Sequence, residues 1–298
     1  MAGMGDAVRV GVVGAGPWAR RVHGPGLFDH EGTRLAAVWA RRPDAAKELA
    51  EPYGADVVDG FEQLLESVDA VAFAVPPAVQ AELAPRAARA RKHLVLEKPL
   101  ATDERGARKI ADAVRESGVA ALMMLTRRFD PEVGRWLSGL RSTDGWRGGT
   151  GRWLAGGLLG GDYAASPWRQ ETAGALIDAG PHAIDLLEAA LGDVDRVPYA
   201  HRSGDDLWQI VFGHVGGATS TLTLSLRVPV QPAVVDFSVY GVRGQSQLGG
   251  RRTAARECYA RMLDDFLAMI HDGETHHPCD VSRGLHLQRV LSDVLAAA

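Results

Sequence analysis

The fold of this chain is decided by the stretch Val8-Arg9-Val10-Gly11-Val12-Val13-Gly14-Ala15-Gly16-Pro17-Trp18-Ala19, in which a β-branched run leads directly into a glycine-rich turn. The turn has the pattern Gly-x-Gly-x-x-Ala, a variant of the dinucleotide-binding fingerprint. The first glycine permits the tight turn, the second lets backbone approach a pyrophosphate, and the alanine allows close packing of helix on strand. A proline suits the first helical turn, where its missing N–H donor is no loss. We therefore predict that a dinucleotide contacts Gly14, Gly16, Pro17, Trp18 and Ala19.

The residues after the second strand bear on the choice of cofactor. Leu35 to Trp39 ends about twenty residues after the glycines, where the residue that contacts the ribose belongs. An acid is expected there for NAD, but the chain continues with Ala40, Arg41 and Arg42. Arginine suits the 2′-phosphate of NADP through bidentate contact. Both arginines could instead be solvated loop charges, but the missing acid leads us to favour NADP over NAD.

Strands and helices alternate through the first part of the chain, which is typical of an α/β fold with a doubly wound parallel sheet. Thr102 is expected to cap a helix whose apolar residues repeat at helical spacing and which ends at Gly118. We therefore predict an N-terminal dinucleotide-binding Rossmann domain over residues 1–125. The remaining residues, 126–298, are assigned to a second α/β domain for substrate binding and oligomerisation.

One predicted strand of the first domain is followed by charged residues at its carboxyl end, where ligands bind. Leu94 to Leu96 is apolar and is followed by Glu97, Lys98 and Pro99. Ligands of open parallel sheets bind beyond the carboxyl ends of the strands. The proline keeps the lysine out of the helical region. An acid, an ammonium and a proline at this position indicate chemistry rather than packing.

The second domain shows a period of two, which indicates antiparallel strands with one packed and one polar face. In Thr219 to Leu226, leucines alternate with Thr221, Thr223 and Ser225, and the pattern recurs in Val235 to Tyr240. A polar face with so little charge favours contact with another subunit. We expect a homodimer or homotetramer through this sheet.

A helix expected near Gly174 to Leu187 carries two polar residues four apart, Asp178 and His182, on one face. Pro181 is expected to disturb the helix there. Asp185 could bond the second ring nitrogen of the histidine. His182 could also be a satisfied core histidine, or the pair could supply two metal ligands, although a third ligand is not evident nearby.

Composition narrows the class of protein. The 298 residues are 46% hydrophobic and 23% charged with a formal net charge of −4, so a basic field for nucleic acid is not expected. Two cysteines are too few for a disulfide framework. Neither a membrane span nor a signal peptide in Met1 to Val8 is expected, so we expect a cytoplasmic protein. His276, His277 and Cys279 lie in a proline-containing loop with poor geometry for zinc, so we expect no metal.

Four motifs occur in a diagnostic order: the glycine-rich turn, Pro76-Pro77, Glu97-Lys98-Pro99-Leu100, and Gly174 to His182. Together they resemble the glucose–fructose oxidoreductase, inositol dehydrogenase and rhizopine-catabolism (Gfo/Idh/MocA) family, over the full chain. The resemblance implies a Rossmann domain followed by an α/β domain whose large, mostly antiparallel open sheet is used in dimers. It also implies hydride exchange between a nicotinamide and a hydroxyl or ketone carbon of a sugar, cyclitol or similar polyol.

By motif match, Lys98 falls on the family's catalytic lysine, and Asp178 and His182 fall on its paired polar residues. Loss of hydride from a carbinol requires a base, for which imidazole is suited, while an ammonium stabilises the developing alkoxide. Pro76, Glu97 and Lys98 are expected to contact the cofactor. The residues expected to contact substrate are Arg128, Trp168 and Arg169.

Three departures from the family pattern put the substrate class in doubt. Gln80 stands where the family often has histidine, Thr172-Ala173-Gly174 replaces a glycine pair or triplet, and the loop region Leu140 to Gly161 is compact. Two other functions stay open. One is a non-catalytic cofactor-binding sensor or co-regulator, and the other is elimination or glycoside cleavage through a transient ketone with retained cofactor.

Overall fold

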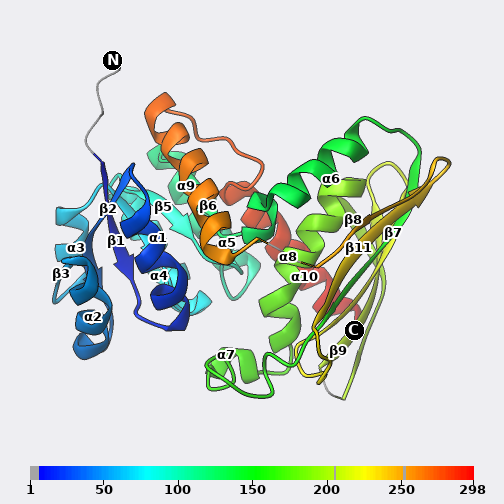
Figure 1. Ribbon diagram of the computed structural model, residues 1–298, viewed down its shortest axis with the longest axis horizontal. Coiled ribbons are helices and arrows are strands. Elements are labelled where there is room, and N and C mark those ends of the chain that lie inside the picture. Colours follow the sequence, from blue (N-terminus) through cyan, green and yellow to red (C-terminus); the bar gives the residue numbers. More distant parts are fainter. Residues whose placement is uncertain (1–6, 205, 251–252) are drawn as a thin grey trace. The chain divides into compact units, whose positions relative to one another are not determined.

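The computed structural model describes residues 7–204, 206–250 and 253–298, which form two compact units (Figure 1). Unit 1 comprises Met1–Thr126 and Ala254–Leu285, and unit 2 comprises Arg127–Thr253 and His286–Ala298. The sequence-based assignment of all residues beyond 125 to one second domain is therefore corrected for 254–285. These residues return to the Rossmann unit, where helix α9 (Ala255–Asp272) packs against the segment after the glycine-rich turn and against strand β6.

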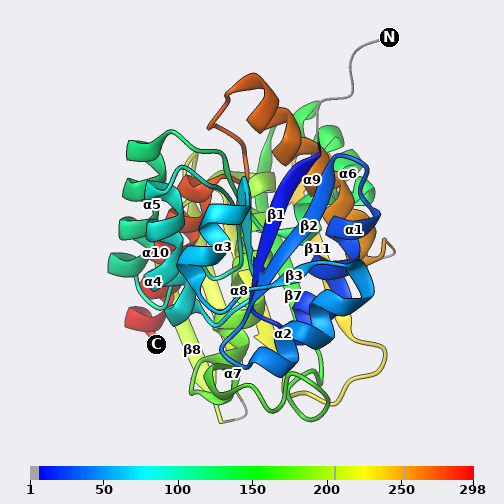
Figure 2. The same cartoon turned by 90° about the vertical axis from the view of Figure 1, so that its left-hand side faces the viewer.

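Unit 1 contains a six-stranded parallel sheet with the order β3-β2-β1-β4-β5-β6, which is the doubly wound Rossmann order. Its strands are β1 (Val8–Val13), β2 (Thr33–Trp39), β3 (Asp56–Val57), β4 (Ala70–Phe73), β5 (His93–Leu96) and β6 (Ala121–Met123). The near-continuous apolar runs follow from burial of both sheet faces. Figure 2 shows β1 and β2 side by side among the helices of this unit.

The other elements of unit 1 connect these strands. They are η1 (Ala19–His23), α1 (Gly24–Asp29), α2 (Pro43–Ala50), η2 (Glu51–Tyr53), α3 (Phe61–Ser67), α4 (Pro77–Arg89), α5 (Glu104–Ser117) and α9. The cap predicted for α5 was one residue off. Asp103 is the cap, and its carboxylate accepts the N–H of Gly106 at 2.7 Å. Gly118 ends the helix in the left-handed conformation at φ 63°, as its position predicted.

Unit 2 contains a second six-stranded sheet with the order β12-β11-β7-β10-β9-β8. The strands are β7 (Trp146–Leu154), β8 (Val194–Ser203), β9 (Leu207–His214), β10 (Thr219–Ser225), β11 (Val234–Gly241) and β12 (Gly244–Leu248). Every pairing is antiparallel except that of β10 with β7. The expectation of a mostly antiparallel open sheet is confirmed.

Helices cover one face of the second sheet and leave the other exposed (Figure 1). The remaining elements are η3 (Thr126–Phe129), α6 (Pro131–Arg141), α7 (Pro167–Gln170), α8 (Gly174–Leu191) and α10 (Val281–Ala297). Helix α8 packs on four of the six strands. In β10, Leu222 and Leu224 are fully buried while Thr221 is exposed, so the alternation predicted from the sequence holds for these residues. Ser225 was expected on the polar face, but it is fully buried at the end of the strand.

Two sequence-based expectations concern the environment of the protein. Among the described residues, no helix is long and apolar enough to cross a membrane. Cys258 and Cys279 are both buried, and they are not joined in a disulfide. The expectation about a signal peptide falls mostly on residues 1–6, which lie outside the described residues.

Candidate active site

The glycine-rich turn of unit 1 has the geometry that a dinucleotide requires. Gly14 has a φ of 103°, and a Cβ there would lie 2.4 Å from the carbonyl oxygen of Ala74, so only glycine fits. A Cβ at Gly16 would meet no atom within 4 Å. Backbone at this second glycine is therefore open to a close approach, and the turn fits a pyrophosphate.

The start of the following helix offers an additional donor. Pro17 and Trp18 are helical, and Ala19 is fully buried where the helix meets the sheet. The indole Nε1 of Trp18 is buried, and no described residue accepts its hydrogen bond. A buried N–H beside the turn is expensive unless something bonds it, so this donor fits a polar ligand at the site.

Three segments leave the sheet at the same edge, the one formed by the carboxyl ends of its parallel strands. Val13, at the end of β1, pairs with Trp39 on one side and with Phe73 on the other. The glycine-rich turn, the arginines after β2 and the prolines after β4 therefore begin beside one another. Arg41 and Arg42 are both exposed and precede α2, while Pro76 caps α4. Directly after β2, residues 40–43 provide two guanidiniums at this edge and contain no carboxylate.

Lys98 lies at this edge as well, directly after β5, and it is half-buried. The Lys98–Pro99 peptide bond is cis. The side chain of Gln80 from α4 forms hydrogen bonds to the backbone of the segment around this bond. This amide donates to the carbonyls of Glu97 and Leu100 at 2.8 and 2.9 Å, and its oxygen accepts the N–H of Glu97 at 2.8 Å.

Gln80 is thus a site residue that sequence reasoning treated only as a departure from a pattern. Its exposed fraction is 1%, and both of its amide protons and its oxygen are used. The usable signal in the sequence was an amide side chain at helical spacing after a double proline. If such a side chain is buried, it needs hydrogen-bond partners. The structure identifies those partners as the backbone on both sides of Lys98 and Pro99.

In unit 2, α8 brings Asp178 and His182 together as their spacing predicted. The helix is continuous through Pro181, so the expected disturbance does not end it. His182 is 8% exposed, and its ring stacks on that of Trp153 with centroids 5.8 Å apart. Asp178 is half-buried and forms an ion pair with Arg169 of α7.

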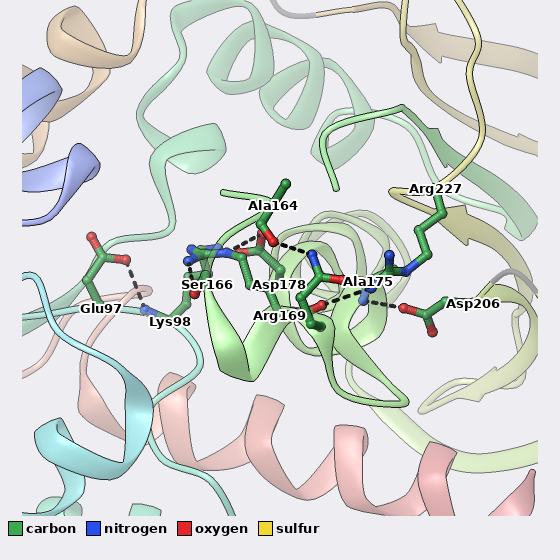
Figure 3. A network of polar contacts seen from close by, with 10 residues as sticks. Glu97, Lys98, Ala164, Ser166, Arg169, Ala175, Asp178, Asp206 and Arg227 are labelled. Atoms are coloured by element: carbon green, nitrogen blue, oxygen red, sulfur yellow. Dashed lines mark hydrogen bonds and ion pairs between the residues drawn. The ribbon is translucent and has the colours of Figure 1, made fainter. Parts of the chain in front are cut away.

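Arg169 is held on several sides (Figure 3). Its Nε and Nη2 donate to the two oxygens of Asp178 at 2.9 and 3.3 Å, and its Nη1 donates to Ser166 Oγ at 3.3 Å. Its guanidinium lies over the rings of Trp168 and Tyr163 at 4.1 and 4.8 Å. Such planar contacts favour arginine over lysine, and they place two of the expected substrate residues against Asp178.

The third expected substrate residue, Arg128, has a different partner from the other two. Its Nη1 donates to Asp185 Oδ1 at 3.0 Å, and the carboxylate side chain is only 1% exposed. Asp185 was expected to support the ring of His182. Its observed ion pair with Arg128 gives it the role of holding η3 against α8, since charged pairs at this depth need close partners.

The beginning of α8 is anchored by another buried carboxylate that sequence reasoning missed. Asp206 accepts the N–H of Ala175 (Figure 3) and the indole N–H of Trp208, both at 2.7 Å. Burial raises the pKa of Asp206 above its usual value, against the opposing effect of those two hydrogen bonds. The anchor fixes the helix that carries Asp178 and His182.

Two further clusters resemble metal ligands. In the loop after α9, His277 bonds the backbone of Cys279 through Nδ1 and pairs with Asp265 through Nε2, so its ring braces the loop. In unit 2, ligand atoms of Glu188, Asp193 and His286 lie within 4.8 Å of one another.

Hydrogen bonding decides the chemistry of that second cluster. Arg289 donates to His286 Nδ1 at 3.0 Å, so Nε2 carries the proton and donates to Glu188 at 2.7 Å. The ring therefore joins α10 to α8 through its hydrogen bond to Glu188.

Comparison with known proteins adds to this geometry. Residues 8–125 match the model of the GFO_IDH_MocA oxidoreductase family, described as having an NAD-binding Rossmann fold. A dTDP-3,4-didehydro-2,6-dideoxy-alpha-D-glucose 3-reductase from Actinomadura kijaniata is 40% identical over 116 residues, which cover 38% of this chain and 35% of the relative. An inositol 2-dehydrogenase from Rhizobium meliloti (strain 1021) is 34% identical over 126 residues, 42% of this chain and 38% of the relative. The matched stretch thus spans little more than a third of either relative.

Solved structures match over nearly the whole chain at low identity. The structure of GenD2 from gentamicin A biosynthesis with NAD has a TM-score of 0.86 and 21% identity, and covers 100% of this chain and 95% of that one. KijD10, a 3-ketoreductase from Actinomadura kijaniata with TDP-benzene and NADP, has a TM-score of 0.80 and 22% identity, with 98% of each chain covered. At such identities the likeness shows the fold alone.

Proposed function

We propose that this chain, whose residues 8–125 match the model of the GFO_IDH_MocA family of oxidoreductases with an NAD-binding Rossmann fold, is an NAD(P)-dependent oxidoreductase. It transfers hydride between a nicotinamide and the hydroxyl or ketone carbon of a sugar, cyclitol or similar polyol. The observation that carries the proposal is the position of Lys98. This lysine follows β5 at the same sheet edge as the glycine-rich turn, and Gln80 fixes the segment that carries it.

The residues divide the chemistry among them. The cofactor, when bound, supplies the hydride acceptor or donor. The ammonium of Lys98 stabilises negative charge on the substrate oxygen as hydride leaves or arrives. His182 exchanges the hydroxyl proton, and Asp178 with Arg169 orients the substrate hydroxyls. Arg128 and Trp168 contribute to the substrate site, and Glu97 contributes to the cofactor site.

The cofactor is proposed to be NADP rather than NAD. Support comes from the exposed Arg41 and Arg42, which follow β2 where an acid would otherwise bond the ribose hydroxyl. A guanidinium there attracts a 2′-phosphate and gives NAD no comparable partner. Among proteins of the same fold, the structures described above contain NAD in one case and NADP in the other.

A homodimer or homotetramer through the exposed face of the second sheet is proposed as well. At its centre, Thr150 of β7 lies between Thr221 of β10 and Ser238 of β11. Aromatic side chains lie further out, with Tyr199 51% and Tyr240 45% exposed. Light scattering should give a multiple of 31.8 kDa for the wild type and a lower mass for Thr150→Arg. A monomeric wild type would refute the assembly.

The proposed function is tested by a substrate panel with NADPH and NADH, followed by absorbance of the reduced nicotinamide. Sugars, inositols and nucleotide-linked keto sugars make up the panel, because the relatives and fold neighbours act on such compounds. A net change in reduced nicotinamide is expected with at least one compound. Product without net change would indicate elimination or cleavage with retained cofactor. Cofactor binding with no product across the panel would indicate a sensor or co-regulator.

A further inference from the structure

A histidine outside the proposed chemistry lies in contact with the segment that carries Lys98. His23 ends η1, one turn beyond the glycine-rich motif, and it is 0% exposed. Its Nε2 lies 3.0 Å from Glu97 Oε1, and its Nδ1 lies 3.2 Å from the hydroxyl of Tyr259 in α9. The tyrosine ring meets the imidazole edge-on at 5.1 Å. Three distant stretches of unit 1 therefore meet at one buried imidazole.

The chemistry of the two partners of His23 places two of the protons in this series of hydrogen bonds. A carboxylate only accepts, so Nε2 of His23 carries the proton that is shared with Glu97. Burial, and then the charge of Glu97, raises the pKa of the Tyr259 phenol well above its usual value, so the hydroxyl keeps its proton. That hydroxyl lies within hydrogen-bond distance of Nδ1, and the tyrosine therefore holds the second nitrogen of the ring.

The series of hydrogen bonds that begins at Tyr259 ends at the backbone N–H of Lys98. Glu97 Oε2 accepts the backbone N–H of Lys98 at 3.3 Å (Figure 3), while Oε1 is bonded by His23. Each oxygen of the carboxylate is held by a different group, so its position relative to Lys98 is fixed. Gln80 holds the backbone of the same segment from the other side.

We propose that His23 and Tyr259 are positioning residues, which act through Glu97 to hold the backbone of Lys98 and thereby set the placement of its ammonium. The inference rests on the proposed function in one respect, the role of Lys98 in hydride transfer. A packing role alone would not need this chemistry, because apolar side chains of the same shape fill buried space without the cost of burying polar groups.

The decisive test measures Lys98 without any substrate. The full-length protein is acetylated with limiting acetic anhydride, and mass spectrometry gives the rate at Lys98 relative to the exposed Lys47. In His23→Leu and Tyr259→Phe the relative rate should rise about threefold, because a segment that loses one of its hydrogen bonds opens more often and exposes the amine to the reagent. His23→Gln should restore the wild-type ratio, since its amide nitrogen can replace Nε2 as donor to Glu97.

A matched control separates the hydrogen bond from the loss of a hydroxyl. Tyr53→Phe, in η2 of the same unit, should leave the labelling ratio unchanged. If His23→Leu fails to fold, Tyr259→Phe still decides the matter. An unchanged ratio in Tyr259→Phe and in every folded His23 variant would overturn the proposal. So would a His23 ring whose Nε2 carries no proton in ¹⁵N NMR of histidine-labelled protein, because such a ring could not donate to Glu97.

Turnover separates this inference from the proposed function. With the panel compound that reacts, His23→Leu and Tyr259→Phe should lower kcat about tenfold and change KM less than twofold, because misplacement of a catalytic group acts on the transition state. Equal changes in kcat and KM across these variants would count against a positioning role. If the wild type reacts with no compound, the proposed function fails, while the labelling result still tests the chain from Tyr259 to Lys98.

Discussion

Gln80→Met should destabilise unit 1 far more than an ordinary surface substitution, because the amide makes three hydrogen bonds to one short segment. Methionine has a similar length but no strong donor or acceptor. Its introduction leaves the N–H of Glu97 and the carbonyls of Glu97 and Leu100 without the partners they have at 2.8 to 2.9 Å. At about 1 kcal/mol for each lost bond, the free energy of unfolding should fall by about 3 kcal/mol.

The measurement is thermal unfolding of the whole chain, together with hydrogen exchange at Glu97. For a unit of this size, about 3 kcal/mol corresponds to a fall in Tm of roughly 6–12 °C. The amide of Glu97 should lose protection more than those of strand β5, since its acceptor is removed. Gln245→Met, at an exposed position of β12, is the matched control and should leave Tm unchanged.

Gln80→Glu sharpens the test by changing only the donor. It keeps an acceptor for the N–H of Glu97 but turns an oxygen toward the carbonyls of Glu97 and Leu100. We expect at least the same loss at pH 8, with partial recovery at lower pH, where a protonated carboxyl again donates one hydrogen bond. A loss below about 1 kcal/mol in both variants would refute the reasoning, since the three bonds would then contribute no more than one typical hydrogen bond.

Three other predictions address activity, cofactor choice and pH. Lys98→Ala should abolish hydride transfer in stopped-flow while leaving NADPH binding measurable by fluorescence, and unchanged turnover would contradict its role. Arg41→Ala should weaken NADP about tenfold or more and NAD little, so equal losses in a titration would show the arginine to be only surface charge. Burial lowers the pKa of His93 below its usual 6.5, and its Nδ1 accepts the N–H of Ala120. The folded state thus binds fewer protons than the unfolded state, and its stability should fall as pH drops below 6.5. His93→Asn keeps an acceptor for the N–H of Ala120 and should flatten this pH dependence of the free energy of unfolding, measured in urea. The same pH dependence in the variant and the wild type would contradict the prediction.

Much of unit 1 was predictable because its signals are local. The glycine-rich turn follows its strand directly, and the apolar runs of β1, β2, β4 and β5 are long enough to show buried strands. Local signals also explain the single-residue error at α5. Thr102 and Asp103 are both good caps, and the choice depends on backbone conformation. Asp103 is extended, with φ −151° and ψ 170°, which lets its side chain reach Gly106.

The return of residues 254–285 to unit 1 was not predictable from periodicity. The apolar stripe of α9 shows that one face is buried, but it does not say which unit it packs against. The deciding contacts join residues more than two hundred positions apart. Tyr259 packs where a Cβ on Gly26 would lie 2.4 Å from its ring, and its hydroxyl meets His23. Such complementarity exists only in three dimensions.

The candidate residues of unit 2 show where spacing carries chemistry and where it fails. Spacing of four placed Asp178 and His182 on one turn of α8, because a helix fixes neighbours at that interval. It gave no sign of the pair between Asp178 and Arg169, which depends on how α7 approaches α8.

That pair changes the assignment of roles. With side chains 16% and 17% exposed, the carboxylate and guanidinium share a setting in which separating them is costly. A substrate hydroxyl that bonds Asp178 must therefore share the carboxylate with Arg169, so the two residues act as one polar unit. The sequence had assigned one to catalysis and the other to substrate binding.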